Sequence, residues 1–231
     1  MKKNVFCFMA VFFAVILFQM NVVYSQHNQE HSHSNADQKQ YEQREERYRV
    51  RMYWQIPNRV LNELGVKPGQ IIGDVGCGIG YFSLRLAEKV GESGKVYASD
   101  IDKGALQYLE ERCRENGIQN IQIILGEEND PLLPKANIDL VMIVNTIQFV
   151  DDPTLFLNNI KSCLKSNGRV AIITWDAEKM DSELPGWSPD DRKKYTLQTI
   201  LRTIYDAKYE VIQMLDFLPM QMIYVCQPRT K

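Results

Sequence analysis

Short apolar segments alternate with amphipathic segments along most of this 231-residue chain, and this alternation constrains its fold most strongly. Seven segments are expected as strands: 70–75, 95–100, 121–125, 138–144, 168–175, 209–217 and 221–227. Helices are expected at 56–64, 81–90, 103–116, 153–164 and 196–207. Strands joined through helices are parallel and covered on both faces. The sequence therefore predicts an α/β, three-layer, doubly wound fold with a mostly parallel seven-stranded sheet.

The end of the chain departs from this pattern. Only Leu218, Pro219 and Met220 separate the last two expected strands. So short a link suits an antiparallel pair and is too short for a parallel crossover. We therefore expect an antiparallel C-terminal strand at one side of the sheet.

A glycine-rich loop follows the first expected strand. Asp74 precedes Gly76, Gly78 and Gly80, and a helix follows. Glycines at such a turn let the backbone come close to a ligand. A dinucleotide-binding loop would need a glycine where Tyr81 stands, and no lysine follows as in a phosphate-binding P-loop. The spacing therefore disfavours both of these phosphate-binding motifs.

Acidic residues follow the next two expected strands. Asp100 ends the second strand, where a carboxylate can accept hydrogen bonds from a ribose diol. Ile101 comes next and can lie against an adenine ring. Glu127 and Glu128 follow the third strand, where an acidic side chain can meet an exocyclic amine. Together these positions indicate a nucleoside site without a means of binding phosphate.

The combined motifs resemble the class I S-adenosylmethionine-dependent methyltransferases, whose fold is Rossmann-like. The similarity covers about residues 54–227 and is strongest to the small-molecule branch with ubiquinone-biosynthesis C-methyltransferases and the type 11 domain. Residues 126–141, GEENDPLLPKANIDLV, resemble the family pattern GDAxxLPxxxxxFDLV. The ending at residues 216–219, DFLP, resembles a group of exported bacterial methyltransferase-like proteins.

This resemblance implies a cofactor, S-adenosyl-L-methionine, and a set of residues that bind it. The glycine loop would hold its methionine end, Asp100 its ribose and Glu127 its adenine amine. Asn145, after the fourth strand, would line the same cleft. The implied cofactor-binding residues are Asp74, Gly76, Gly78, Asp100, Ile101, Glu127, Glu128 and Asn145.

No catalytic residue is predicted. The family often has His-His or His-Trp after the fourth strand, and here Gln148 and Phe149 occupy that place. Glutamine cannot act as a general base, which puts any reaction needing proton removal by that residue in doubt. Methyl transfer from a sulfonium relies mainly on positioning, so an obligatory catalytic side chain need not exist. Tyr53, Trp54 and Tyr81 are either acceptor-pocket or ordinary packing residues.

The first 25 residues differ from the rest. Lys2 and Lys3 precede an unbroken apolar run from Val5 to Phe18, and small Ser25 follows. This order predicts a secretory signal peptide, cleaved after Ser25. An uncleaved anchor with peripheral membrane contact is the alternative, although membrane helices need about 20 apolar residues. We therefore expect an exported protein, periplasmic or secreted.

The remaining organisation follows from composition. Residues 26–53 are expected as a polar linker and N-terminal helix, and 54–231 as the methyltransferase domain. All three histidines lie in this linker, which is expected to be solvated and to bind no metal. The scattered cysteines suggest packing, and the net charge of -2 gives no reason to expect a nucleic acid partner. The oligomeric state is left open.

Two functions fit these features. The first is a methyltransferase acting on a small molecule. The second is an exported, non-catalytic nucleoside-binding protein of the same fold, because fold does not fix function. The intact cofactor loop favours the enzyme. Export and the lack of histidine in the expected domain favour the binding protein.

Overall fold

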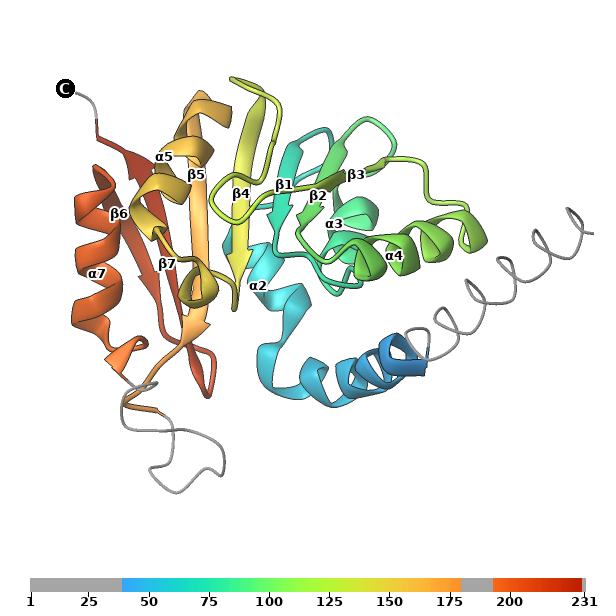
Figure 1. Cartoon of the computed structure of the whole chain (residues 1–231), viewed down its shortest axis with the longest axis horizontal. Coiled ribbons are helices and arrows are strands. Elements are labelled where there is room, and N and C mark those ends of the chain that lie inside the picture. Colours follow the sequence, from blue (N-terminus) through green and yellow to red (C-terminus); the bar gives the residue numbers. More distant parts are fainter. Residues whose placement is uncertain (1–38, 180–192, 230–231) are drawn as a thin grey trace, which may run out of the picture. The chain divides into compact units, whose positions relative to one another are not determined.

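The computed structural model describes residues 39–179 and 193–229 (Figure 1). The chain divides into two compact units, 1–43 and 44–231. Only residues 39–43 of the first unit are described, and they are helical. The predicted signal peptide and the three histidines lie outside the described residues. No helix within the described ranges has the length and apolar character that crossing a membrane requires.

The unit 44–231 contains a seven-stranded sheet in the order β3-β2-β1-β4-β5-β7-β6. Its strands are β1 (Ile71–Val75), β2 (Lys95–Asp100), β3 (Ile121–Leu125), β4 (Ile138–Val144), β5 (Leu164–Trp175), β6 (Tyr209–Leu215) and β7 (Gln221–Pro228). β7 is antiparallel to both β5 and β6, and all other neighbours are parallel. The predicted mixed sheet with an antiparallel C-terminal strand is confirmed.

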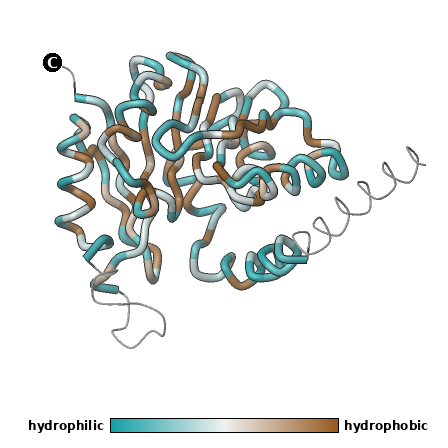
Figure 2. Tube along the Cα trace, in the orientation of Figure 1, coloured by the Kyte–Doolittle hydropathy of each residue, from teal (hydrophilic) through white to brown (hydrophobic). Residues whose placement is uncertain are grey.

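Helices cover both faces of the sheet. They are α2 (Pro57–Glu63), α3 (Ser83–Val90), α4 (Lys103–Glu115), the short η1 (Ile147–Phe149), α5 (Pro153–Cys163) and α7 (Leu197–Asp206). α5 and α7 pack on one face, and α2 and α3 on the other. Alternate residues of β4 supply the two cores, with Val141 and Ile143 facing α5 and Leu140 and Met142 facing α3. Hydrophobic residues accordingly run along the central strands in Figure 2.

Local sequence signals explain several element boundaries. The Asp152 side chain accepts a hydrogen bond from the Leu155 N–H at 2.9 Å, and Pro153 begins α5, as predicted. β5 begins earlier than expected, at Leu164, because that residue pairs with Ile138 ahead of a register shift. A second shift occurs in edge strand β6, between Val211 and Gln213.

The order of the strands fixes where a ligand can bind. β1 lies between β2 and β4, so the connections leaving β1 and β4 run to opposite sides. Open α/β sheets bind ligands beyond the carboxyl ends of the strands at such a switch point. The residues that follow β1, β2, β3 and β4 meet there.

Candidate functional site

A pocket of about 490 Å³ opens at this carboxyl edge, within the range of small-molecule sites. Six of the eight predicted cofactor residues line it: Gly76, Asp100, Ile101, Glu127, Glu128 and Asn145. The structure therefore brings together residues from the ends of β1, β2, β3 and β4. Asp74 and Gly78 are not among the lining residues.

Asp74 lies behind the wall of the pocket. Side chains alternate along a strand, and Asp74 is on the same face of β1 as Ile72, toward α3. It is 2% exposed, and its Oδ2 accepts a hydrogen bond from Ser83 Oγ at 2.6 Å. Burial raises the pKa of the Asp74 carboxyl to about 6, against the opposing effects of the Ser83 hydrogen bond and the Arg51 charge. Asp74 thus ties β1 to the start of α3.

The glycine loop is held by its own backbone amides. The N–H groups of Gly76 and Cys77 donate to the Ser99 carbonyl at 2.8 and 3.1 Å. The Gly78 N–H donates to Asp100 Oδ2 at 2.7 Å. These three amides therefore fix the loop against β2.

Gly76 is required by its neighbours as well as by its backbone. Its φ of 71° lies in the left-handed region. A Cβ there would lie 2.0 Å from Thr146 Oγ1, the residue that follows Asn145. This close approach joins the ends of β1 and β4 and leaves Asn145 at the pocket wall.

Asp100 combines a structural and a ligand-facing position. Its Oδ1 accepts from the Asp102 N–H at 2.9 Å while Oδ2 accepts from Gly78. Each carboxylate oxygen can accept more than one hydrogen bond, so both oxygens remain able to accept from a diol. The backbone bonds hold the carboxylate in a single orientation at the pocket.

The far end of the pocket has an acidic rim. The Glu127 N–H donates to the Asp130 carbonyl at 2.7 Å, closing a short turn after β3. Glu127 and Glu128 are exposed, and Ile101 presents an apolar surface that is 61% exposed. Gly126 fits closely beneath them, since a Cβ there would lie 2.8 Å from Ser99 Oγ.

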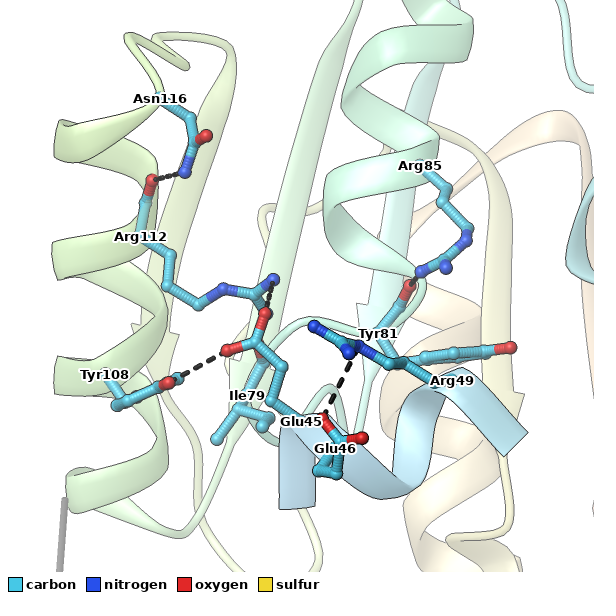
Figure 3. A network of polar contacts seen from close by, with 9 residues as sticks. All are labelled: Glu45, Glu46, Arg49, Ile79, Tyr81, Arg85, Tyr108, Arg112 and Asn116. Carbon is cyan, nitrogen blue, oxygen red and sulfur yellow. Dashed lines mark hydrogen bonds and ion pairs between the residues drawn. The ribbon is translucent and has the colours of Figure 1, made fainter. Parts of the chain in front are cut away.

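The helical segment 44–55 adds to the pocket a residue that sequence analysis missed. Arg44 lines the pocket, and its guanidinium lies 3.6 Å from the Asp102 carboxylate. Glu45 pairs with Arg112 at 2.7 Å and accepts a hydrogen bond from the Tyr108 hydroxyl at 2.9 Å (Figure 3). Arg112 in turn donates to the Ile79 carbonyl of the glycine loop at 3.1 Å. The segment is therefore attached both to α4 and to the loop.

Aromatic packing strengthens that attachment. The Tyr48 and Tyr81 rings meet edge to face with centroids 4.6 Å apart, and the Arg51 guanidinium lies 4.3 Å from the Tyr81 centroid. Trp54 stacks on Trp175 at 5.1 Å, while Tyr53 is 83% exposed. Tyr53, Trp54 and Tyr81 do not line the pocket described above.

The charge of the pocket is predominantly negative. Five acidic residues and one arginine line it, together with apolar side chains such as Phe149, Val150 and Phe156. The acidic residues are Asp100, Asp102, Glu127, Glu128 and Asp151. Such a surface attracts a cationic ligand and repels a pyrophosphate.

Several lining residues carried no sequence signal. Arg44 lies in a charged segment with nothing to distinguish it from its neighbours. Thr146 and Asp151 could have been found by extending the search beyond Asn145 along the connection after β4. Among residues 39–179 and 193–229, no cluster of three or more His, Cys, Asp or Glu side chains could hold a metal ion.

The fold and this pocket define a Rossmann-like protein with an acidic pocket at the carboxyl edge of its sheet. Residues 67–216 match the family model described as "Methyltransferase domain". The chain belongs to this methyltransferase-domain family.

Comparison with individual proteins agrees with this family assignment. The chain is 28% identical over 129 residues to aklanonic acid methyltransferase DauC of a Streptomyces species, covering 56% of this chain and 59% of that protein. It is 30% identical over 113 residues to demethylmenaquinone methyltransferase of a Geobacillus species, covering 49% and 48%. The chain thus spans about half to three fifths of the length of these curated relatives.

A solved structure extends the similarity over more of the fold. The SAM dependent methyltransferase from Aquifex aeolicus superposes with a TM-score of 0.66 at 28% sequence identity. The match covers 74% of this chain and 88% of that one.

Proposed function

We propose that this protein is an S-adenosylmethionine-dependent methyltransferase acting on a small organic acceptor. The observation that carries the proposal is the position of Asp100, held by Gly78 and Asp102 at a predominantly acidic pocket beside the glycine loop. Membership of the methyltransferase-domain family supports it.

The residues of the pocket fit the cofactor. Asp100 accepts hydrogen bonds from the ribose hydroxyls, and Ile101 packs against adenine. Glu127 and Glu128 lie where the adenine amine can donate to them. The acidic lining suits a ligand that carries a sulfonium and an ammonium group, whereas it opposes the phosphates of a dinucleotide.

When bound, S-adenosylmethionine supplies a methyl group on a positively charged sulfur. The protein has to align the acceptor with that methyl group, an effect worth up to about 7–11 kcal/mol in well-oriented reactions. Phe149, Val150 and Phe156 give the pocket apolar surface against which an organic acceptor can pack. Gln148 accepts a hydrogen bond from Thr174 Oγ1 at 3.5 Å, and its amide cannot remove a proton. The residues present thus support catalysis by positioning.

A small acceptor agrees with the site and the relatives. Two relatives are named as methyltransferases of aklanonic acid and of demethylmenaquinone, both small molecules. A nucleic acid acceptor is disfavoured because the pocket is acidic and the chain has a net charge of -2.

Binding and transfer should be measured separately. Calorimetric titration of the purified protein with S-adenosylmethionine tests the site. Gln213→Glu, on the exposed part of β6 and outside the pocket, is a control that should leave the affinity unchanged. Incubation with methyl-labelled S-adenosylmethionine and a cell-envelope extract tests transfer, with labelled products separated by mass. Detection of methyl-labelled small molecules among the products would support the proposal. Binding without transfer would favour the non-catalytic nucleoside-binding protein, and absence of binding would refute both functions.

We also propose that the protein is exported, from its first 25 residues alone. Lys2 and Lys3, the apolar run and Ser25 support cleavage before Gln26. N-terminal sequencing of protein from the native host tests this, and a start at Gln26 is expected. An intact Met1 in the membrane fraction would favour an anchor and the membrane contact that accompanies it. An intact Met1 in the cytosolic fraction would refute export.

A further inference from the structure

A buried chain of side chains connects the helical segment 44–55 to the pocket. Arg51 Nε donates a hydrogen bond to Gln55 Oε1. Gln55 Nε2 donates to Gln221 Oε1 at 2.8 Å, and Gln221 Nε2 donates to Asn145 Oδ1 at 2.6 Å. Both glutamines are 0% exposed, so water cannot take over their hydrogen bonds. This relay crosses from the start of the unit, through β7, to the end of β4.

The relay has a fixed direction. A guanidinium has donors and no acceptor, so Arg51 requires the oxygen of Gln55 to face it. Gln55 must then present its nitrogen to Gln221, and Gln221 its nitrogen to Asn145. The final consequence is that Asn145 accepts through Oδ1 and directs Nδ2 elsewhere. Asn145 lines the pocket, and within residues 39–179 and 193–229 its Nδ2 has no hydrogen-bond partner.

The pocket needs a donor near the glycine loop. The amides of Gly76, Cys77 and Gly78 already donate within the protein. Thr146 Oγ1 also donates internally, to the Val144 carbonyl at 3.1 Å. A carboxylate at the methionine end of a ligand therefore finds these four donors occupied, whereas Asn145 Nδ2 is available.

We propose that Asn145 Nδ2 donates to the carboxylate of the bound methyl donor, and that Arg51 sets this orientation through Gln55 and Gln221. Arg51, Gln55 and Gln221 are positioning residues, since they act through Asn145. The inference rests on the proposed function and adds to it a source of specificity: the relay selects a ligand that keeps its carboxylate. An Asn145 amide turned the other way would face that carboxylate with an oxygen and repel it.

Gln55→Glu tests the direction of the relay. The new carboxylate still accepts from Arg51, but it cannot donate to Gln221. Gln221 must then turn its nitrogen toward position 55 and its oxygen toward Asn145. Asn145 responds by donating to Gln221, which leaves Oδ1 facing the pocket.

The measurement compares the dissociation constants of S-adenosylmethionine and decarboxylated S-adenosylmethionine. The wild-type protein should prefer the intact compound roughly tenfold or more, as expected for a charge-assisted hydrogen bond. Gln55→Glu should weaken intact S-adenosylmethionine by a similar factor and change binding of the decarboxylated compound less than twofold. Asn145→Asp, which keeps the acceptor for Gln221 and has no donor, should also abolish the preference. Gln213→Glu adds the same charge on the exposed part of β6 and should change neither constant.

Each outcome decides one question. The relay is supported if Gln55→Glu and Asn145→Asp both lose the preference for intact S-adenosylmethionine while their midpoints of thermal unfolding stay within a few degrees of wild type. An unchanged preference, or an equal loss for both compounds, overturns it while leaving the proposed function intact. If the wild-type protein binds neither compound, the proposed function fails and this inference fails with it.

Discussion

Replacing the buried carboxyl of Asp74 should change how the stability of the protein depends on pH. The pKa of this group rises from 3.8 to about 6 on folding, chiefly because burial removes the carboxylate from water. The folded state therefore holds a proton on Asp74 between about pH 4 and 6, where the unfolded chain has lost it. Its stabilising contribution is complete below pH 3.8 and is lost as the pH rises through 6.

The size of this loss follows from the shift in pKa. Each pKa unit corresponds to about 1.4 kcal/mol, so a shift of roughly two units corresponds to about 3 kcal/mol. Asp74→Asn cannot ionise and avoids this loss. The free energy of unfolding of the variant minus that of wild type should therefore rise by about 2.5 kcal/mol between pH 4 and pH 7, then remain level.

Urea unfolding at half-unit pH steps measures this difference. Only its slope with pH is needed, since the cost of placing an amide beside Ser83 is the same at every pH. Asp206→Asn, at the last residue of α7 with a side chain 50% exposed, controls for the loss of one negative charge. A difference that stays constant from pH 4 to 7 would show that folding does not desolvate Asp74, and would refute the reasoning.

Three other predictions concern the pocket. Asp100→Asn should weaken S-adenosylmethionine binding roughly tenfold or more in calorimetry, because charge-assisted bonds to ribose are lost; equal affinity would remove Asp100 from the site. Gly76→Ala should destabilise the fold by about 2–4 kcal/mol in chemical unfolding, because its Cβ would collide with Thr146 and its φ is left-handed. Adding Thr146→Ala to this variant should restore only part of the lost stability, since the unfavourable φ remains. An unchanged stability of Gly76→Ala would contradict the close approach. Titration with NAD should give no measurable binding, because its pyrophosphate would meet the acidic lining; binding tighter than that of S-adenosylmethionine would overturn the proposed function.

The fold was predictable because its signals are local. Residues 95–100, 121–125 and 138–144 form strands at the predicted bounds, since turn residues flank each apolar run. Asp152 and Pro153 mark the start of α5 by capping chemistry alone. The early start of β5 was not predictable, because polar Lys165, Ser166 and Asn167 carry no strand signal and lie in the register shift between the pairs made by Leu164 and Arg169.

The candidate site was predictable only in part, because sequence fixes position along a strand better than the contacts of a side chain. Asp100 ends β2 and Asn145 follows β4, and both lie at the pocket because these strands end at the same edge of the sheet. Asp74 ends up behind the wall because its side chain faces α3, where Ser83 binds it. Gln55 and Gln221 are 166 positions apart in sequence, and no local pattern indicates that they meet.

The register shift in β6 has a consequence for self-association. β6 lies at the end of the sheet, and Ile212 and Met214 are 45% and 43% exposed. A straight, apolar edge strand would offer its free backbone groups to the edge of another copy. The extra residue between Val211 and Gln213 interrupts the regular spacing of those groups and increases the local twist. A second strand cannot continue the ladder in register past this point, so the irregularity protects the open edge against sheet-to-sheet aggregation.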